Sequence, residues 1–192
     1  MNKTDCDFDF EQSFFDGVLI ITPFIRYDSR GSFVKDYNEN VFMTNGESFP
    51  LKETFYTQSY KNTIRALHFQ REKQMPKLIR CLKGRIFDVI VDLRADSQTF
   101  SKWFGIELSD ENNKAVLIPA GFGHGYLALT DAFVSYKCGE VFYPEYDDGI
   151  LWNDPDIGIE WPIASGETII ISDKDLCLQS FSDFRERYGQ LL

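Results

Sequence analysis

Residues that bind transition metals are scarce in this sequence. The 192-residue chain has two histidines, His68 and His124, and its four cysteines are scattered without a CxxC pair: Cys6, Cys81, Cys138 and Cys177. A structural or catalytic zinc site needs three or four Cys, His or carboxylate ligands at short characteristic spacings. We therefore expect no metal, and the unpaired pattern of cysteines is typical of a reduced, cytoplasmic protein.

Positive charge and long apolar runs are also lacking. The chain has 20 Lys and Arg against 30 Asp and Glu, a formal net charge of −10. This balance argues against nucleic acid as the main partner, because binding a phosphate backbone needs a broad basic face. It still allows one small anionic ligand held by a few local cations. No apolar run is long enough to span a membrane, and the acidic residues 1–12 lack the hydrophobic core of a signal peptide.

Aromatic residues are abundant, at 16% of the chain with 18 Phe, and they favour pleated sheets and large apolar cavities. Segments rich in β-branched and aromatic residues recur along the sequence: 17–22, 32–37, 53–60, 63–70, 77–84, 85–94, 102–109, 115–119, 125–130 and 133–143. Lys83-Gly84 is typical of a hairpin turn. Helical periodicity occurs in residues 180–192 and briefly around residues 38–43. We predict a single all-β domain, residues 1–192, folded as a sandwich or a jelly roll with short peripheral helices.

His68 lies in TIRALHFQ, residues 63–70. Strand alternation would put Ala66, His68 and Gln70 on one face and Arg65 on the other, so a regular strand separates Arg65 from His68. A local bend could bring both to one site. A metal cupin usually has HxH here, but position 70 is Gln. Taken alone, His68 is better explained as a core histidine.

His124 lies among Gly121, Gly123 and Gly125 in the sequence PAGFGHG. These glycines permit backbone conformations that other residues avoid, which suggests a backbone shaped to present the imidazole. A tight turn with an incidental histidine remains the alternative.

Seven stretches, taken together, resemble the dTDP-4-dehydrorhamnose 3,5-epimerase family over residues 17–180: DSRGSF (28–33), IRALHFQ (64–70), PKLIRCLKG (76–84), FDVIVDLR (87–94), IPAGFGHGY (118–126), SYKCGEVFYP (135–144) and LWNDPDIGIEWP (151–162). The resemblance implies a cupin-type jelly roll (a double-stranded β-helix), usually a homodimer, that binds a nucleotide sugar without metal or cofactor.

The resemblance also implies roles for single residues. His68 resembles the general base, Asp175 its orienting partner, Lys77 the lysine that stabilises the enolate, and Tyr136 the acid on the opposite face. Other positions resemble substrate-binding residues: Arg30 and Arg65 for the diphosphate, and Phe33, Gln70, His124, Phe142 and Asp147 for the rest of the ligand. These residue types suit the chemistry, because a neutral imidazole, an ammonium and a phenol can remove, stabilise and return a proton at a carbon next to a ketone.

The sequence departs from the family at several places. Ala66 replaces the Gly of RGLH, and Phe142 stands where many members have Tyr. Lys35 stands where thymidine-using members commonly carry Glu, and such members carry Gln and Asn near the positions of Glu53 and Phe55, counted back from Arg65. The catalytic set therefore looks intact, whereas the set that recognises the nucleotide looks altered.

We predict an isomerase that inverts C3, C5 or both beside the keto group of a nucleotide-4-keto-6-deoxysugar. The default substrate is dTDP-4-dehydro-6-deoxy-D-glucose, converted to dTDP-4-dehydro-L-rhamnose in the pathway that supplies dTDP-rhamnose for polysaccharides. A relative acting on a different nucleotide-linked 4-ketosugar is the nearest alternative. A non-catalytic sugar-nucleotide-binding cupin and a metal-dependent cupin oxygenase are alternatives from other classes.

Overall fold

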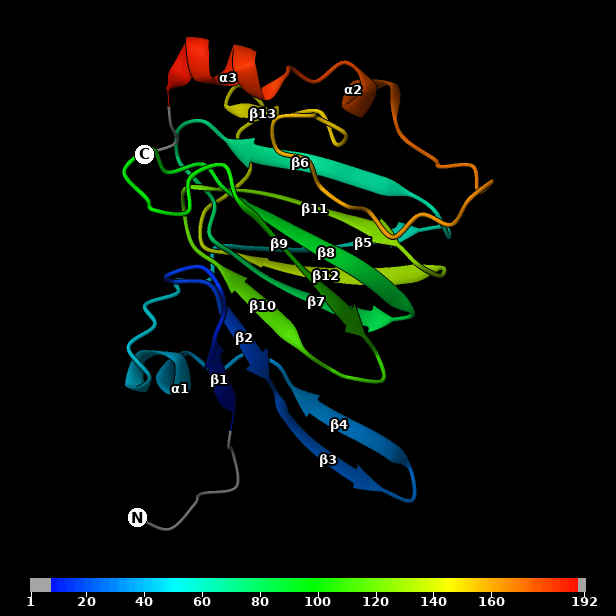
Figure 1. Ribbon diagram of the computed structural model, residues 1–192. Coiled ribbons are helices and arrows are strands. Elements are labelled where there is room, and N and C mark those ends of the chain that lie inside the picture. The colour runs from blue at the N-terminus through cyan, green and yellow to red at the C-terminus, as the bar shows by residue number, and fades with distance from the viewer. Residues whose placement is uncertain (1–7, 190–192) are drawn as a thin grey trace.

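The computed structural model describes residues 8–189, so Cys6 and most of the acidic N-terminal stretch lie outside the described residues. The chain forms two large antiparallel sheets that face each other (Figure 1). One sheet has six strands, in the order β1 (Asp9–Gln12), β2 (Leu19–Thr22), β10 (Ala115–Ile118), β7 (Lys77–Lys83), β12 (Ala132–Cys138) and β5 (Glu53–Ser59). The other has five, in the order β13 (Asp147–Gly149), β6 (Ile64–Gln70), β11 (Phe122–Ala128), β8 (Arg85–Asp92) and β9 (Trp103–Ser109).

Successive strands alternate between the two sheets through most of β5 to β13, which is the winding of a jelly roll. The predicted all-β class and cupin-type jelly roll are therefore confirmed. The described helices are short and peripheral: α1 (Glu39–Thr44), α2 (Asp173–Leu176) and α3 (Phe181–Tyr188). The predicted hairpin at Lys83-Gly84 is wrong. Gly84 makes the turn with a positive φ of 80°, but β7 and β8 join different sheets.

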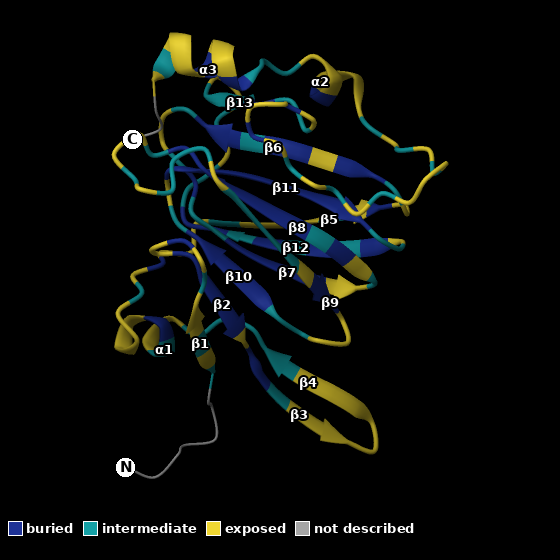
Figure 2. Ribbon diagram, viewed as in Figure 1, coloured by how far each residue is buried: buried dark blue, intermediate teal, exposed yellow. Residues whose placement is uncertain are grey.

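The main core fills the space between the sheets because the strands alternate inward apolar and outward polar residues. In β12 the alternation is regular: Ala132, Val134, Tyr136 and Cys138 are buried, and the residues between them are partly exposed. A second apolar cluster lies on the outer face of the five-stranded sheet, where the C-terminal segment and α3 cover it with Phe181 and Phe184 (Figures 1 and 2). The C-terminal chain thereby passes close to β6.

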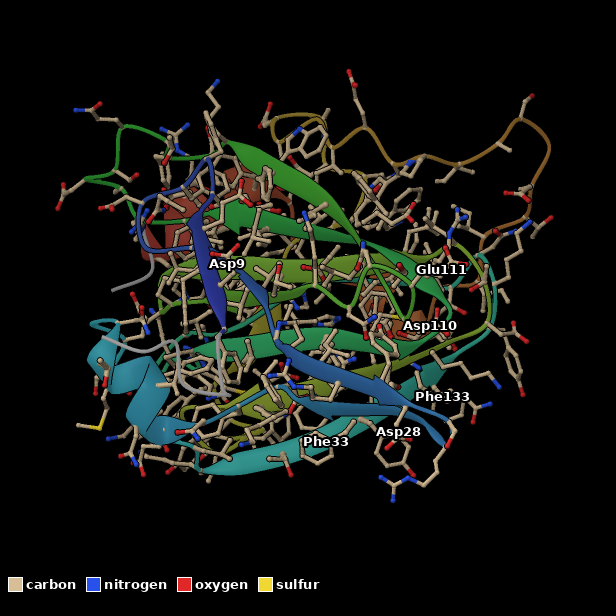
Figure 3. All side chains as sticks on the ribbon, turned by 90° about the horizontal axis from the view of Figure 1, so that it is seen from below. Asp9, Asp28, Phe33, Asp110, Glu111 and Phe133 are labelled. Atoms are coloured by element: carbon tan, nitrogen blue, oxygen red, sulfur yellow. The ribbon has the colours of Figure 1, made fainter. Side chains whose placement is uncertain are left out.

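A two-stranded hairpin of β3 (Phe24–Asp28) and β4 (Gly31–Lys35) extends away from the two sheets (Figure 1). Its outer half is exposed, and Tyr27 and Phe33 are among the most exposed aromatic residues of the described chain (Figure 2). Viewed from below, Asp28 lies at the far end of this hairpin (Figure 3). Within one chain the hairpin is thus held mainly by its own pairing.

Candidate active site

A cavity of about 490 Å³ opens between the two sheets on the side of β5 and β6. Nine of the eleven residues predicted to form the site line it: Arg65, His68, Gln70, Lys77, His124, Tyr136, Phe142, Asp147 and Asp175. They come from both sheets, from α2 and, for Phe142, from the segment between β12 and β13. The structure therefore brings together the whole predicted catalytic set.

A β-bulge in β6 brings Arg65 and His68 to the same cavity. His124 pairs with His68, but Tyr126, two residues later, pairs with Arg65, three residues earlier. The extra residue in β6 breaks the regular alternation, so the strand has the kind of local bend that could bring Arg65 and His68 to one site. Ala66 and Leu67 are both fully buried on the bulge, and both belong to the outer apolar cluster. As a result Arg65 and His68, three residues apart in β6, both face the cavity.

His68 pairs with a carboxylate that comes from far along the chain. Its Nε2 lies 3.2 Å from Oδ2 of Asp175, on the first turn of α2. Ser172, the N-cap of α2, donates its hydroxyl to Oδ1 of the same carboxylate at 2.9 Å. The backbone N–H of Ala66, in the bulge, also donates to Oδ2 at 3.3 Å. The carboxylate is thus fixed by three partners and aimed at the imidazole.

Electrostatics keep this carboxylate ionised. Burial raises the pKa of Asp175, but the hydrogen bond and charge of His68, with the bonds from Ser172 and Ala66, outweigh burial and hold the pKa below its ordinary value of 3.8. An ionised Asp175 that accepts Nε2–H from His68 leaves Nδ1 as the unprotonated ring nitrogen. The arrangement can therefore hold a neutral imidazole ready to accept a proton.

Lys77 and Tyr136 occupy the six-stranded sheet, opposite His68. Lys77 opens β7 and is partly buried, and burial lowers the pKa of its ammonium, partly offset by the charges of Cys138, Asp147 and Asp88. Tyr136 lies on β12, and burial raises the pKa of its phenol well above 10.0. The phenol is therefore protonated at neutral pH and able to donate. Its ring stacks on Phe55, with centroids 4.6 Å apart, and meets His124 edge-on.

His124 belongs to a second histidine–aspartate pair, which sequence reasoning missed. Its Nε2 lies 2.8 Å from Oδ1 of Asp88, and both side chains are buried. His124 lies within β11 rather than in a turn. Of its flanking glycines, Gly121 alone has a positive φ, of 94°, so the expected special backbone conformation is wrong for Gly123 and Gly125. One signal for Asp88 was available, because a lone carboxylate interrupts the apolar run of β8.

Other lining residues are engaged with neighbouring groups. Gln70 donates its amide to the carbonyl of Lys73 at 2.7 Å and accepts the N–H of Tyr143 at 2.6 Å, so it ties two loops together. Asp147 forms an ion pair with Lys174. Glu53 accepts the N–H of Phe142 at 2.7 Å. Lys174 and Ser172 also line the cavity and were not predicted as site residues.

Arg30 and Phe33 lie apart from the cavity of their own chain. Both belong to the β3–β4 hairpin region, and Arg30 pairs with Asp28 across the turn at 2.6 Å. The Arg30 side chain is 88% exposed. The two predicted diphosphate arginines are therefore not brought together within one chain.

Two absences concern residues 8–189 of the chain. No group of three or more His, Cys, Asp or Glu side chains there could hold a metal ion. No helix in that part of the chain is long and apolar enough to cross a membrane.

Comparison with known proteins places this cavity in a family. The family model described as dTDP-4-dehydrorhamnose 3,5-epimerase matches residues 12–183. The chain belongs to the dTDP-4-dehydrorhamnose 3,5-epimerase family. A relative of that name from Methanothermobacter thermautotrophicus is 48% identical over 170 residues, covering 88% of this chain and 92% of the relative. The family resemblance predicted from sequence is thus confirmed, and the chain is an isomerase of the epimerase type.

Solved structures of family members share the fold. The Legionella pneumophila 3,5-epimerase, solved in complex with dTDP-4-keto-L-rhamnose, superposes with a TM-score of 0.87 at 34% identity, covering 91% of this chain and 93% of that one. A 3'-monoepimerase from Streptomyces bikiniensis, in complex with dTDP-quinovose, gives 0.83 at 30% identity and covers 91% and 88%.

Proposed function

We propose that this epimerase binds dTDP-4-dehydro-6-deoxy-D-glucose and inverts C3 and C5, giving dTDP-4-dehydro-L-rhamnose. One observation carries the proposal: the base and the acid project from opposite sheets into one cavity. His68 comes from the five-stranded sheet, and Tyr136 comes from the six-stranded sheet. A flat enolate held between the sheets would meet the base on one face and the acid on the other. Inversion requires that arrangement.

In the first step, Nδ1 of His68 takes the proton from a carbon next to the C4 ketone. The electron pair of the C–H bond forms a carbon–carbon double bond, and the carbonyl pair moves onto oxygen. Asp175 stabilises the imidazolium that results. The ammonium of Lys77 lies in the same cavity and stabilises the enolate oxygen.

In the second step, the phenol of Tyr136 gives its proton to the same carbon from the other face. The double-bond electrons form the new C–H bond and the C4 ketone returns. The imidazolium of His68 then releases its proton to water, and the phenolate of Tyr136 regains one from water. No oxidation occurs, so the two steps need no redox partner. Repetition at the second carbon gives the doubly inverted sugar. The catalytic roles are assigned from this geometry and from the family resemblance. They concern His68, Asp175, Lys77 and Tyr136.

The diphosphate is assigned to Arg65 and Arg30. Arg65 lines the cavity, where its Nε donates to the hydroxyl of Ser59 at 3.0 Å. Arg30 can join it only from a second copy of the chain, because the β3–β4 hairpin points away from its own cavity (Figure 1). This requirement, together with the exposed Tyr27 and Phe33, supports the predicted homodimer. Light scattering should give twice the chain mass, and Arg30→Ala should weaken dTDP binding without changing that mass.

A substrate with a different nucleotide is the first alternative, and two residues that line the cavity support it. Glu53 and Phe55, on β5, line the cavity, and the family resemblance implies amides near these positions in thymidine-using members. The Glu53 carboxylate cannot donate a hydrogen bond, and it already holds the N–H of Phe142. Inversion of a single carbon is a second alternative, because the similar Streptomyces bikiniensis protein is a 3'-monoepimerase. We also propose that the epimerase acts in the cytoplasm.

One experiment tests substrate and stereochemistry together. The purified protein is incubated in D2O with dTDP-, UDP-, GDP- and CDP-linked 4-keto-6-deoxysugars, and deuterium at C3 and C5 is followed by NMR. We expect exchange and inversion at both carbons with the dTDP sugar. His68→Asn is the control, and it should reduce exchange about 10²- to 10⁴-fold, the usual contribution of acid–base catalysis. A preference for another nucleotide would show that the substrate is not the dTDP sugar. Absence of exchange with every sugar would refute the epimerase mechanism.

A further inference from the structure

Phe55 covers the ring of Tyr136. The two residues lie directly opposite each other on β5 and β12. Their rings are 4.6 Å apart between centroids and nearly parallel, at 11°. Phe55 is 40% exposed and lines the cavity, whereas Tyr136 is 7% exposed. Phe55 therefore shields the phenol ring on the side that would otherwise be open.

Ring packing alone holds Tyr136 in place. The hydroxyl of the neighbouring Tyr126 is fixed by Ser59 and Thr57, at 2.8 and 2.9 Å. By contrast, no residue among 8–189 forms a hydrogen bond with the Tyr136 hydroxyl. The ring instead makes a parallel contact with Phe55 and an edge contact with His124, at 6.0 Å and 74°. The direction of the O–H bond thus depends on how these rings hold the tyrosine.

We propose that Phe55 is a positioning residue for the proton-donating tyrosine. It fixes the ring of Tyr136 so that the phenol points at the face of the enolate opposite His68. The inference rests on the proposed function, because it needs Tyr136 to act as the acid. It assigns Phe55 to the second proton transfer and not to the first, since His68 lies on the other sheet and its partner Asp175 lies on α2.

This role differs from a substrate contact by hydrogen bonding. Position 55 carries no polar atom in its side chain, so it cannot form a hydrogen bond with the substrate. Its side chain can only shape the cavity and stack on a neighbouring ring. Catalytic geometry is sensitive to such support, because a displacement of about 1 Å in a reacting group can reduce a rate on the order of 10²-fold.

The test compares exchange with inversion in Phe55 variants, using whichever ketosugar the wild-type protein inverts. Both quantities are measured in the same D2O reaction, by NMR for deuterium at C3 and C5 and by product analysis for configuration. In Phe55→Ala we expect inversion to fall on the order of 10²-fold while exchange stays close to wild type. Phe55→Tyr keeps the stacked ring and should restore inversion. Phe55→Leu keeps apolar bulk without the flat ring and should behave like Phe55→Ala.

The matched control is Tyr60→Ala, which removes an exposed aromatic ring just after β5 and outside the cavity. It should leave both quantities unchanged. Thermal unfolding identifies any variant that fails to fold. If Phe55→Ala does not fold, exchange and inversion are compared in Phe55→Leu instead. The inference is overturned if exchange and inversion fall in parallel in a folded variant, if neither falls, or if Leu restores inversion as well as Tyr does. A wild-type protein that inverts no ketosugar would instead contradict the proposed function.

Discussion

At the scale of single residues, the proposed mechanism assigns the two proton transfers to different side chains, so the transfers can be separated. Tyr136→Phe removes the phenolic proton but keeps the ring, so the cavity wall should stay packed. His68, Asp175 and Lys77 remain, so the enolate should still form, and His68 can return a solvent-exchanged deuteron to the original face. We expect deuterium to enter the sugar while inversion is lost. NMR of the product distinguishes this from loss of both, which would place Tyr136 in the first step.

The pH dependence of turnover should reveal Lys77. Its pKa is lowered by burial from 10.5, and the enolate needs the charged form. Activity should therefore fall as pH rises through a value below that of an ordinary lysine. The phenol of Tyr136 does not explain such a decrease, because burial raises its pKa. Lys77→Arg should shift the decrease to higher pH, since a guanidinium stays charged. An unchanged alkaline limb in that variant would assign the limb to another group.

At the scale of strands, the close approach of β6 and β11 depends on a glycine. A Cβ on Gly125 would lie 2.4 Å from Cβ of Ala66 and 2.7 Å from the carbonyl oxygen of Arg65, at the bulge. Gly125→Ala should therefore reduce the free energy of unfolding by about 1–3 kcal/mol, the usual cost of overpacking, and displace the bulge. Gly139→Ala is the control, because a Cβ there makes only ordinary contacts of 3.5 Å. Urea denaturation of both variants measures the difference.

The same strands show what the sequence can reveal. Most of the strands coincide with segments rich in β-branched and aromatic residues, because a half-buried strand must alternate such residues. β13 was missed because Asp147, Asp148 and Gly149 carry no apolar signal. The four-residue helix α2 was missed because it is too short for any periodicity, although Asp175 on it was identified through the family motif.

Two features of the site depend on contacts distant in sequence and had no local signal. The bulge in β6 is a register shift against β11, so it exists only once the two strands pair. The position of Arg30 depends on where the hairpin stands relative to the sheets (Figure 1). By contrast, the pairing of His124 with Asp88 connects two neighbouring strands, and the isolated charge in β8 was a usable indication.

At the scale of the whole molecule, acid should destabilise the fold through buried carboxylates. Burial raises the pKa of Asp92, but hydrogen bonds from Arg94, Ser97 and Thr99 bring it below 3.8, and the pKa of Asp175 is likewise lowered. Groups whose folded pKa is lowered stabilise the protein fully above their unfolded pKa. The stabilisation is lost as pH falls through the folded value.

We therefore expect the free energy of unfolding to decrease as pH falls below about 4, the ordinary range of Asp. Urea titrations at a series of pH values measure it. Asp92→Asn should be less stable than wild type at neutral pH and should show a weaker dependence on acid. Equal acid sensitivity of the two proteins would attribute the effect to other carboxylates.

The position of Asp175 has a consequence for proteolysis and for the order of synthesis. Every strand of both sheets precedes α2 in the chain. A chain cleaved just before residue 172 would retain the strand residues Arg65, Lys77 and Tyr136, yet lose the carboxylate that orients His68. Such a fragment, if it stays folded, would compete for the nucleotide sugar without converting it. During translation, likewise, the strands that line the ligand cavity are synthesised before Asp175, which orients the proposed base. We therefore expect turnover to begin only after α2 and α3 have been synthesised.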